Sequence, residues 1–421
     1  MQVLEIVGDR RLSGETEIQG AKNAVLPILA ATLLGDGECV IHNCPNLSDV
    51  KTGIEILKGL GAECHYNADE KTAYICCDNA SECIISEKLM CEMRSSVMFL
   101  GAILARCKKA RICYPGGCEL GPRPIDIHLK AFRELGVKIE EYSGFIYCEL
   151  EKYNPSVINL QIPSVGATEN IMLLCAGLKG ETVIENAACE PEIMDLQNFL
   201  RKMGADICGA GTSKIIIRGT DKLKGTEYKV IPDRIVATTY LCAAAACGGD
   251  ILIKNAESAH LMPQLSLFKE SGCKITASEN EVRLRCKARP LALRMIKTSP
   301  YPGFPTDAQA IFMSLMSLAE GTTVFVENIF ESRYKHITEL IKMGADITAE
   351  GRVAVVRGCD LLQGARVTAA DLRGGAALAV AGLSAFDKTV VCGIEHIERG
   401  YEDIGRDLSA LGGNIKKTDI F

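Results

Sequence analysis

The chain has 421 residues, of which 48% are hydrophobic, and it carries a formal net charge of −6. This length exceeds one typical hydrophobic core and predicts two or three domains. The acidic balance and the lack of a long basic run argue against a nucleic-acid-binding surface, so local arginines would have to bind any anionic ligand.

Twenty cysteines raise the question of disulfides or bound metal. The spacings favour neither, because no Cys-x-x-Cys pair occurs and the six histidines are scattered without a metal-ligand motif. Several cysteines, such as Cys113, Cys175, Cys242 and Cys392, lie in apolar runs, where a free thiol behaves as a small hydrophobic group. We therefore expect reduced cysteines and no metal.

No segment predicts a secretory signal or a membrane span. The start, MQVLEIVGDRRLSG, lacks a basic region followed by an apolar core. The apolar runs near 97–105 and 375–386 are shorter than the roughly 18 residues that a membrane helix needs. The sequence thus predicts a soluble, cytoplasmic protein without a membrane partner.

Six segments of about 70 residues follow one plan from end to end. Each has an apolar helix, a short β-branched strand, a second helix and a further strand. The second helix ends at a glycine, the usual terminator because it adopts the left-handed conformation easily. These glycines are Gly61, Gly136, Gly204, Gly272, Gly344 and Gly412. An open solenoid is the alternative, but solenoid repeats are usually shorter, and units this large favour closed domains.

The first helix of each repeat is apolar on nearly every side, which predicts a buried helix. The six helices are expected near 21–34, 94–106, 167–178, 234–247, 307–319 and 372–385. The strands that follow them are expected near 38–43, 110–115, 181–186, 250–255, 322–328 and 389–393.

Charged residues recur at the starts of these helices, where free N–H groups favour anions. Lys22 and Asn23 open the first helix and Arg94 the second, Asp307 the fifth, and Asp371 with Arg373 the sixth. Any one of them could be an ordinary cap or surface charge, but their recurrence favours an anion-binding site.

The segment YPGGCELGPRPIDIH, residues 114–128, carries the clearest chemical signal. Cys118 follows the pair Gly116-Gly117 and precedes Arg123 by five residues. Paired glycines allow a mobile loop, and a nearby guanidinium favours the thiolate. The alternative is that Cys118 is one of twenty cysteines placed by composition, which its neighbours argue against.

This segment resembles the catalytic loop of the UDP-N-acetylglucosamine enolpyruvyl transferases, also called UDP-N-acetylglucosamine 1-carboxyvinyltransferases. The resemblance covers most of the chain, in the strings GAKNAVLPILAATLL, MRSSVMFLGAILAR, SVGATENIM, ENAACEPEIMD, IPDRI, FPTDAQA, ENIFESRYKH, DLRGGAAL and HIERGYE. It implies a two-domain inside-out α/β barrel of α+β type, built from six units with buried helices inside and sheets outside. One domain would span 22–231 and carry the cysteine loop. The other would comprise 1–21 and 232–421 and carry Asp307, Arg333, Arg373 and Arg399.

The resemblance implies transfer of an enolpyruvyl group from phosphoenolpyruvate to the 3′-hydroxyl of UDP-N-acetylglucosamine, with phosphate release by addition and elimination. This is the first committed step of peptidoglycan synthesis, catalysed without a cofactor, and the enzyme is expected to be a monomer. The implied phosphoenolpyruvate residues are Lys22, Asn23, Arg123, Arg333, Arg373 and Arg399.

The same resemblance assigns the catalytic roles and the nucleotide-sugar site. Cys118 is the implied proton donor and Asp307 contacts the sugar hydroxyl and takes its proton, with Lys22 and Arg399 also catalytic. An N-cap role for Asp307 is the structural alternative. The implied nucleotide-sugar residues are Arg94, Arg123, Pro124, Ile125, Asp126, Ile127, His128, Ser164, Val165, Gly166, Asp307 and Ile329, with His128 beside the uracil or the diphosphate.

Three positions depart from the expected pattern or qualify it. Cys189 and Val236 stand where an arginine and a glutamate are usual, and Glu119 lies beside the thiol, where it could raise the thiol pKa. Two alternatives remain. Enolpyruvylshikimate-phosphate synthase shares the fold and the donor but lacks the cysteine loop. A non-catalytic sensor or scaffold would be expected to lose Cys118, Lys22 or an arginine.

Overall fold

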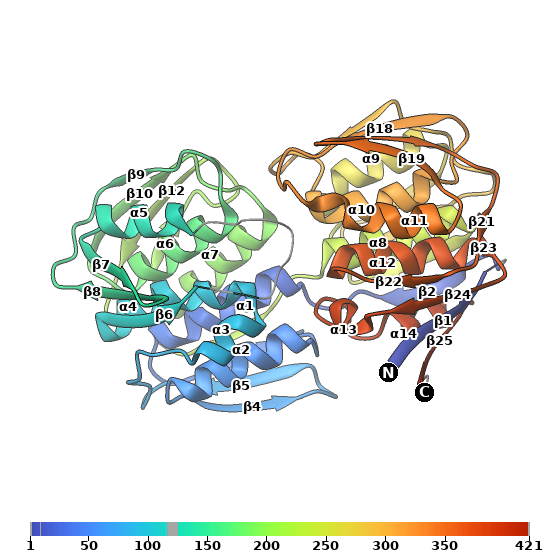
Figure 1. Ribbon diagram of the computed structural model, residues 1–421. Coiled ribbons are helices and arrows are strands. Elements are labelled where there is room, and N and C mark those ends of the chain that lie inside the picture. The colour runs from blue at the N-terminus through green and yellow to red at the C-terminus, as the bar shows by residue number, and fades with distance from the viewer. Residues whose placement is uncertain (1, 9, 115, 117–124, 420–421) are drawn as a thin grey trace. The chain divides into compact units, whose positions relative to one another are not determined.

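The computed structural model describes residues 2–8, 10–114, 116 and 125–419. They form two compact units (Figure 1). The continuous unit holds the described residues of Gly20–Cys118 and Pro122–Ile231, and the discontinuous unit holds those of Met1–Gln19 and Pro232–Phe421. Cys118, Arg123, Pro124 and Glu119 lie outside the described residues.

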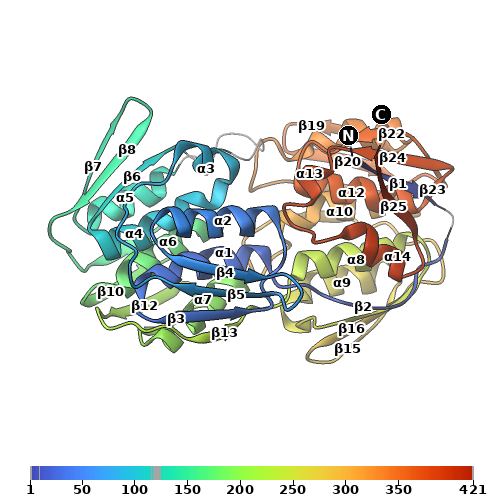
Figure 2. The same cartoon turned by 90° about the horizontal axis from the view of Figure 1, so that it is seen from below.

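Each unit repeats the predicted plan three times. The buried first helices of the continuous unit are α1 (Lys22–Ala31), α4 (Phe99–Cys107) and α6 (Val165–Ala176). Those of the discontinuous unit are α8 (Arg234–Ala246), α10 (Thr306–Met316) and α12 (Leu372–Leu383). Their small and branched apolar residues are buried on almost every side, as a helix without a polar face requires. In each unit these helices lie inside and the sheets lie outside (Figures 1 and 2).

The second helices are amphipathic and cover the first. They are α2 (Ser48–Gly59), α5 (Asp126–Glu134), α7 (Pro191–Met203), α9 (Met262–Glu270), α11 (Ile337–Lys342) and α14 (Ile404–Ala410). Shorter turns complete the helical structure: η1 (Thr32–Leu34), α3 (Glu87–Glu92), η2 (Arg94–Met98), η3 (Ser258–Leu261), η4 (Arg333–His336) and α13 (Ile394–Ile397).

The strands of the continuous unit form three sheets. One has the order β13 (Glu227–Lys229), β3 (Glu38–His42), β5 (Thr72–Cys76) and β4 (Glu63–Asn67). The second has β6 (Lys109–Cys113), β8 (Phe145–Leu150) and β7 (Val137–Tyr142). The third has β11 (Asp206–Cys208), β12 (Lys214–Gly219), β10 (Gly180–Glu185) and β9 (Val157–Asn159).

The discontinuous unit has three matching sheets. The first has the order β15 (Lys274–Ala277), β16 (Glu281–Arg285), β14 (Asp250–Lys254) and β2 (Ser13–Glu17). The second has β17 (Met295–Lys297), β18 (Thr322–Val326), β20 (Val353–Arg357) and β19 (Asp346–Glu350). The third has β22 (Arg366–Thr368), β24 (Lys388–Cys392), β1 (Gln2–Val7) and β25 (Asn414–Asp419). A small pair joins β21 (Leu362–Gln363) to β23 (Ala385–Phe386). Among the described residues the strands thus form separate small sheets rather than one closed barrel of strands.

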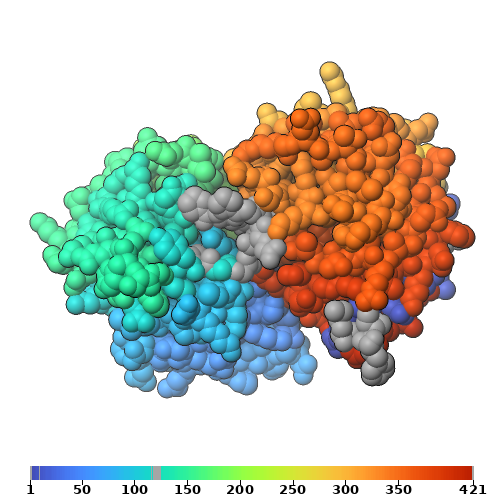
Figure 3. Space-filling view, in the orientation of Figure 1, coloured from blue at the N-terminus to red at the C-terminus, as the bar shows by residue number. Residues whose placement is uncertain are grey.

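The chain passes between the units through strands that pair in the unit they leave. β2, which precedes α1 in the chain, runs parallel to β14 of the discontinuous unit. β13, which precedes α8, runs parallel to β3 of the continuous unit. Each unit therefore has its own hydrophobic core. In the space-filling view the dark blue N-terminal residues lie among the orange and red atoms of the discontinuous unit (Figure 3).

All six predicted terminator glycines have the left-handed backbone conformation, with φ between 91° and 114°. In α7 the N–H of Gly204 bonds to the C=O of Arg201, and the N–H of Ala205 bonds to that of Leu200. This is the Schellman arrangement, which satisfies the last carbonyls of the helix. The spacing of the glycines in the sequence therefore marks the end of one helix in every repeat.

Two of these glycines provide a stability test. Gly344→Ala is expected to cost about 1–2 kcal/mol, the strain of a left-handed alanine, because nothing lies within 4 Å of the added Cβ. Gly136→Ala is expected to cost more, since its Cβ would lie 2.2 Å from the carbonyl oxygen of Lys152. Urea unfolding midpoints would compare the two variants, and equal losses would contradict this account.

Among the described residues, no helix is long and apolar enough to cross a membrane. Every cysteine in these ranges is a free thiol.

Candidate functional site

A carboxylate held by two buried arginines forms the centre of the site residues in the discontinuous unit. Asp307, in the first turn of α10, accepts from Nη2 of Arg333 through Oδ1 at 3.0 Å and from Nη2 of Arg373 through Oδ2 at 3.1 Å. The arginine side chains are only 2% and 3% exposed, whereas the carboxylate is 27% exposed. The three predicted residues therefore form one cluster, which we call the Asp307 clamp.

The N-cap alternative for Asp307 is wrong. The helix begins one residue earlier, with Pro305 at the N-cap position and no side-chain cap. Asp307 points to the arginines because each guanidinium presents a planar set of donors that fits a carboxylate oxygen.

A buried hydroxyl chain holds the second arginine of the clamp. Tyr401 lies 3.5 Å from Nη1 of Arg373 and 2.7 Å from Oγ1 of Thr239. Because Thr239 donates its own proton to Ile235 O, Tyr401 donates to Thr239 and its oxygen accepts from the arginine. Burial opposes the charge of Arg373, but the negative charge of Asp307, with that of Asp233 and the hydrogen bond to the neutral Tyr401 hydroxyl, outweighs burial and raises the guanidinium pKa above its ordinary value.

A second carboxylate, which is buried, organises the neighbouring loop. Glu327 is 1% exposed, and its Oε1 accepts from the backbone N–H groups of Ile329 and Phe330 at 2.8 and 3.1 Å. Its Oε2 accepts from the hydroxyl of Thr306, directly before Asp307. Ile329, which is 37% exposed, is therefore tied to the start of α10.

Arg399 is half-buried in the turn after α13, and Gln19 holds this turn. Nε2 of Gln19 donates to Gly400 O at 3.1 Å, and its Oε1 accepts from the N–H of Glu402 at 2.9 Å. Tyr401, which contacts Arg373, lies between these two residues in the chain, so the turn that carries Arg399 also carries the hydroxyl that supports the Asp307 clamp.

Lys22 starts α1 of the continuous unit and is buried. Its Nζ lies 2.7 Å from Oδ2 of Asp49, in the first turn of α2, and both side chains are less than one-tenth exposed. The neighbouring Asn23 is exposed. A buried lysine held by a carboxylate keeps its charge in a fixed place, as the binding of an anion requires.

Three elements bring the described nucleotide-sugar residues of the continuous unit together. His128 lies in the first turn of α5, Ser164 is the N-cap of α6 and accepts from Ala167 N–H, and Arg94 begins η2. Burial, and then the charge of Arg94, lower the pKa of His128 to about 4. A Cβ on Gly166 would lie 3.2–3.3 Å from the imidazole, so the ring packs against the start of α6.

The other described residues predicted for this site differ in exposure. Ile125 is buried, Ile127 and Val165 are half-buried, and Asp126 is exposed at the start of α5. No cluster of three or more metal-ligating side chains occurs in the described part of the chain.

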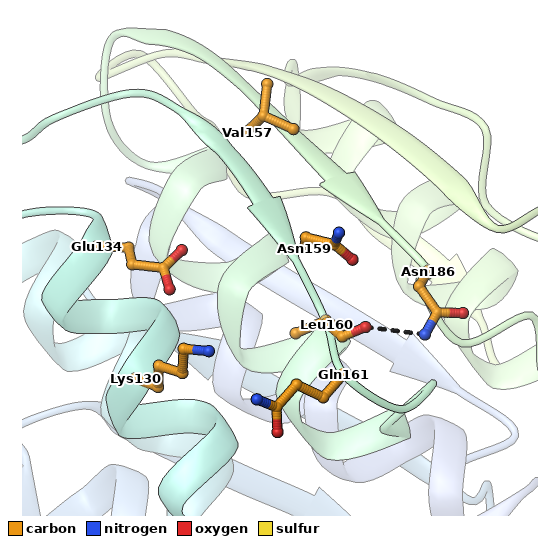
Figure 4. Close-up of a pocket in the computed structure, with 7 residues that line it drawn as sticks. All are labelled: Lys130, Glu134, Val157, Asn159, Leu160, Gln161 and Asn186. Atoms are coloured by element: carbon orange, nitrogen blue, oxygen red, sulfur yellow. Dashed lines mark hydrogen bonds between the residues drawn. The ribbon is translucent and has the colours of Figure 1, made fainter.

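An open pocket of about 530 Å³ lies beside α5 and the end of β9 (Figure 4). Its lining residues are Lys130, Glu134, Val157, Asn159, Leu160, Gln161 and Asn186. Asn186 donates to Leu160 O at 2.8 Å, which fixes one wall. None of the predicted site residues lines this pocket.

Two buried histidines predict how stability depends on pH. Burial lowers the pKa of His128 and of His336 to about 4. In each case the histidine takes up a proton below about pH 6.5 in the unfolded state, but it stays neutral in the folded state until the pH approaches 4. The stabilisation is therefore complete above pH 6.5 and is lost as the pH falls towards 4, by up to about 3 kcal/mol per histidine.

Thermal midpoints between pH 7.5 and 4.5 would measure this loss. His336→Gln should weaken the decline relative to the unmodified protein, whereas His65→Gln, at an exposed strand position, should not. Parallel pH curves for all three proteins would contradict the prediction.

Sequence reasoning missed three residues that contact the predicted site residues or the segments that carry them: Asp49, Glu327 and Tyr401. In the sequence, Asp49 cannot be distinguished from an ordinary acidic residue in the first turn of a helix, here α2. Glu327 and Tyr401 lie inside recognised strings, ENIFESRYKH and HIERGYE, but nothing local distinguishes them. Only their distant partners reveal their roles.

Comparison with known proteins places the chain in a family. A sequence model of the EPSP synthase (3-phosphoshikimate 1-carboxyvinyltransferase) family matches residues 6–408. UDP-N-acetylglucosamine 1-carboxyvinyltransferase 2 of Caldanaerobacter subterraneus is 52% identical over 99% of both chains. UDP-N-acetylglucosamine 1-carboxyvinyltransferase 1 of Carboxydothermus hydrogenoformans is 45% identical over 100% of this chain and 99% of its own.

Solved structures agree on the fold. The enolpyruvyl transferase NikO from Streptomyces tendae matches with a TM-score of 0.90 and 25% identity, over 100% of this chain and 99% of its own. EPSP synthase from Acinetobacter baumannii matches with a TM-score of 0.77 and 17% identity over 100% of both chains. The chain therefore belongs to the UDP-N-acetylglucosamine 1-carboxyvinyltransferases, within the EPSP synthase family, and has their two-domain inside-out α/β fold.

Proposed function

We propose that this chain transfers the enolpyruvyl group of phosphoenolpyruvate to the 3′-hydroxyl of UDP-N-acetylglucosamine and releases phosphate. The observation that carries the proposal is identity of 44–52% over nearly the full length with proteins named for this transfer. The reaction is the first committed step of peptidoglycan synthesis, and the enzyme acts as a cytoplasmic monomer.

Fixed cations bind phosphoenolpyruvate, which carries a phosphate and a carboxylate on three carbons. Lys22, Arg123 and Arg399 form the cradle that binds phosphoenolpyruvate, with Asn23 beside Lys22, and Arg333 and Arg373 lie on its carboxylate side. The burial of Lys22 against Asp49 and of both arginines against Asp307 supports these roles, because preorganised charges need no rearrangement when the anion arrives.

The chemistry needs one proton acceptor and one proton donor. In the addition step the 3′-oxygen forms a bond to C2 of phosphoenolpyruvate, Asp307 takes the hydroxyl proton, and Cys118 gives a proton to C3. In the elimination step the Cys118 thiolate takes a proton back from C3 and the C2–C3 double bond re-forms. The C2–oxygen bond to phosphate breaks, and phosphate leaves with the electron pair of that bond and the proton that Asp307 held. Asp307 is the only side chain of the clamp that is partly exposed, which suits contact with the sugar.

The nucleotide sugar is held by the residues around α5, α6 and η2, with contributions from Asp307 and Ile329. Ser164, Val165 and Gly166 lie at a helix N-terminus, where free N–H groups favour a diphosphate. Arg94 and Arg123 add charge, and Pro124, Ile125, Asp126, Ile127 and His128 complete the site.

We extend this proposal to the domains. Residues 22–231 form the domain with the cysteine loop, and residues 1–21 with 232–421 form the domain with Asp307, Arg333, Arg373 and Arg399.

Phosphate release tests the function directly. The protein is mixed with phosphoenolpyruvate and UDP-N-acetylglucosamine, and each substrate is omitted in turn. Release that requires both substrates is the expected result. A folded protein that binds the nucleotide sugar but releases no phosphate would instead indicate a sensor or scaffold.

The same assay distinguishes the related synthase activity. Shikimate 3-phosphate replaces the nucleotide sugar as acceptor, and no release is expected. The relatives at 44–52% identity are all named for the nucleotide sugar, whereas the EPSP synthase structures are 17–18% identical to this chain.

A further inference from the structure

Asn170, in the middle of α6, is buried completely and has every hydrogen-bonding group of its side chain engaged. Its Oδ1 accepts from the backbone N–H of Gly101 at 2.7 Å. Its Nδ2 donates to the backbone carbonyl of Val97 at 2.8 Å and lies 3.0 Å from Nδ1 of His128.

The two backbone partners determine which way the amide faces. A backbone N–H can only donate and a carbonyl can only accept, so Oδ1 must face Gly101 and Nδ2 must face Val97. The second proton of Nδ2 then points to His128, and Nδ1 of that ring must be the acceptor. Because the low pKa keeps this histidine neutral at pH 7, its single proton is on Nε2.

The Nε2 edge of the ring faces the start of α6. A Cβ on Gly166 would lie 3.3 Å from Nε2, so this N–H lies beside the turn at Ser164 to which we assign the diphosphate. Asn170 also joins Val97 and Gly101, which are four residues apart at the junction of η2 and α4. A side chain at Gly101 would lie 2.3 Å from the carbonyl oxygen of Asn170, so close packing here requires glycine.

The other unit contains an internal comparison. His336 precedes Gly344 by eight residues, as His128 precedes Gly136, and it is also buried with a lowered pKa. Neither ring nitrogen of His336 has a side-chain hydrogen-bond partner among the described residues. Six residues after the N-cap of α12, where α6 has Asn170, the chain has Ala377. The repeat therefore accommodates a buried histidine without an amide partner.

We propose that Asn170 is a positioning residue of the nucleotide-sugar site, which holds His128 as the Nε2–H tautomer so that this N–H donates to an oxygen of the nucleotide sugar. The same amide holds the η2–α4 junction, which carries Arg94, against α6. The ligand contact rests on the proposed function, whereas the tautomer does not.

Nitrogen NMR of protein labelled with ¹⁵N-histidine tests the tautomer in the unmodified chain. The six histidine signals are separated with His128→Gln, which removes one of them. We expect protonated Nε2 and unprotonated Nδ1 from pH 8 to pH 6. A protonated Nδ1, or a mixture of tautomers, would overturn the proposal, and this measurement requires neither a variant at position 170 nor activity.

Asn170→Asp tests the consequence for binding. A carboxylate oxygen facing Nδ1 favours a proton there, which leaves Nε2 as an acceptor. We expect the Nδ1–H tautomer and a rise of about 10- to 100-fold in Kd for UDP-N-acetylglucosamine by calorimetry, with KM for phosphoenolpyruvate nearly unchanged.

Asn255→Asp is the matched control. Nδ2 of Asn255 also donates to a backbone carbonyl, that of Ile18, at 2.7 Å, but in the other unit. This variant should change Kd less than threefold. Equal effects of the two substitutions, or an unchanged Kd for Asn170→Asp, would overturn the positioning role. An Nε2–H tautomer in a protein that binds no nucleotide sugar would support the tautomer and contradict the proposed function.

Discussion

Replacing Asp307 by alanine is expected to lower kcat by about 10²- to 10⁴-fold and the free energy of unfolding by about 2–4 kcal/mol. The catalytic loss follows from removal of the proposed proton acceptor. The stability loss follows because Arg333 and Arg373, both nearly inaccessible to water, would face each other without the carboxylate between them. Turnover by phosphate release and the thermal midpoint would be measured on the same preparation.

Asp250 offers a matched control for this prediction. It also lies between two arginines, Arg283 at 2.8 Å and Arg285 at 2.7 Å, but all three side chains are more than 40% exposed. Asp250→Ala should therefore cost less than about 1 kcal/mol and leave turnover intact. An Asp307→Ala variant as stable as Asp250→Ala would show that the buried clamp does not depend on its carboxylate.

Replacing Cys118 by alanine is expected to lower turnover near neutral pH by about 10²- to 10⁴-fold, because the proposed donor of the proton to C3 is lost. The unfolding midpoint should not change, in contrast to the Asp307 variant. Steady-state phosphate release at saturating substrates, with the thermal midpoint alongside, would measure both effects. Turnover equal to that of the unmodified protein would remove Cys118 from the acid role.

Labelling with an epoxide tests the reactivity of the Cys118 thiol independently of turnover. Fosfomycin, in the presence of UDP-N-acetylglucosamine, should add once to the protein by intact mass. Cys208→Ala, which removes an exposed cysteine on β11, should retain this adduct, whereas Cys118→Ala should lose it. An adduct on the Cys118→Ala protein would place the reactive thiol elsewhere among the cysteines.

Much of the fold could be predicted because the information is local and occurs six times. A helix that is apolar on all sides is expected to be buried. A glycine at the end of the second helix of a repeat is expected to adopt a left-handed conformation. Both features are confirmed in every repeat, from Gly61 to Gly412. The pairing of β2 and β13 was not predictable in this way, because short strands of similar composition could join any of several sheet edges.

For the candidate site, the sequence and its family resemblance predict a list of residues but not their arrangement. The types at the helix starts, such as Lys22, Asp307 and Arg373, indicate anion chemistry without any coordinates. The sequence is nevertheless equally compatible with Asp307 as the N-cap of a helix. Only the folded chain shows that Asp307 lies between Arg333 and Arg373, which are 26 and 66 residues away in the sequence.

The sequence by itself determined the six repeats and their buried helices, because these depend on residue type and on short-range pattern, and its resemblance to a known family implied the class of reaction. Only the tertiary structure decided which charges meet. Lys22 faces Asp49, Asp307 faces two arginines, and the Asn170 amide joins α4 to His128 from 42 residues away. Such pairings depend on how helices distant in the chain pack together, and no local pattern encodes that geometry.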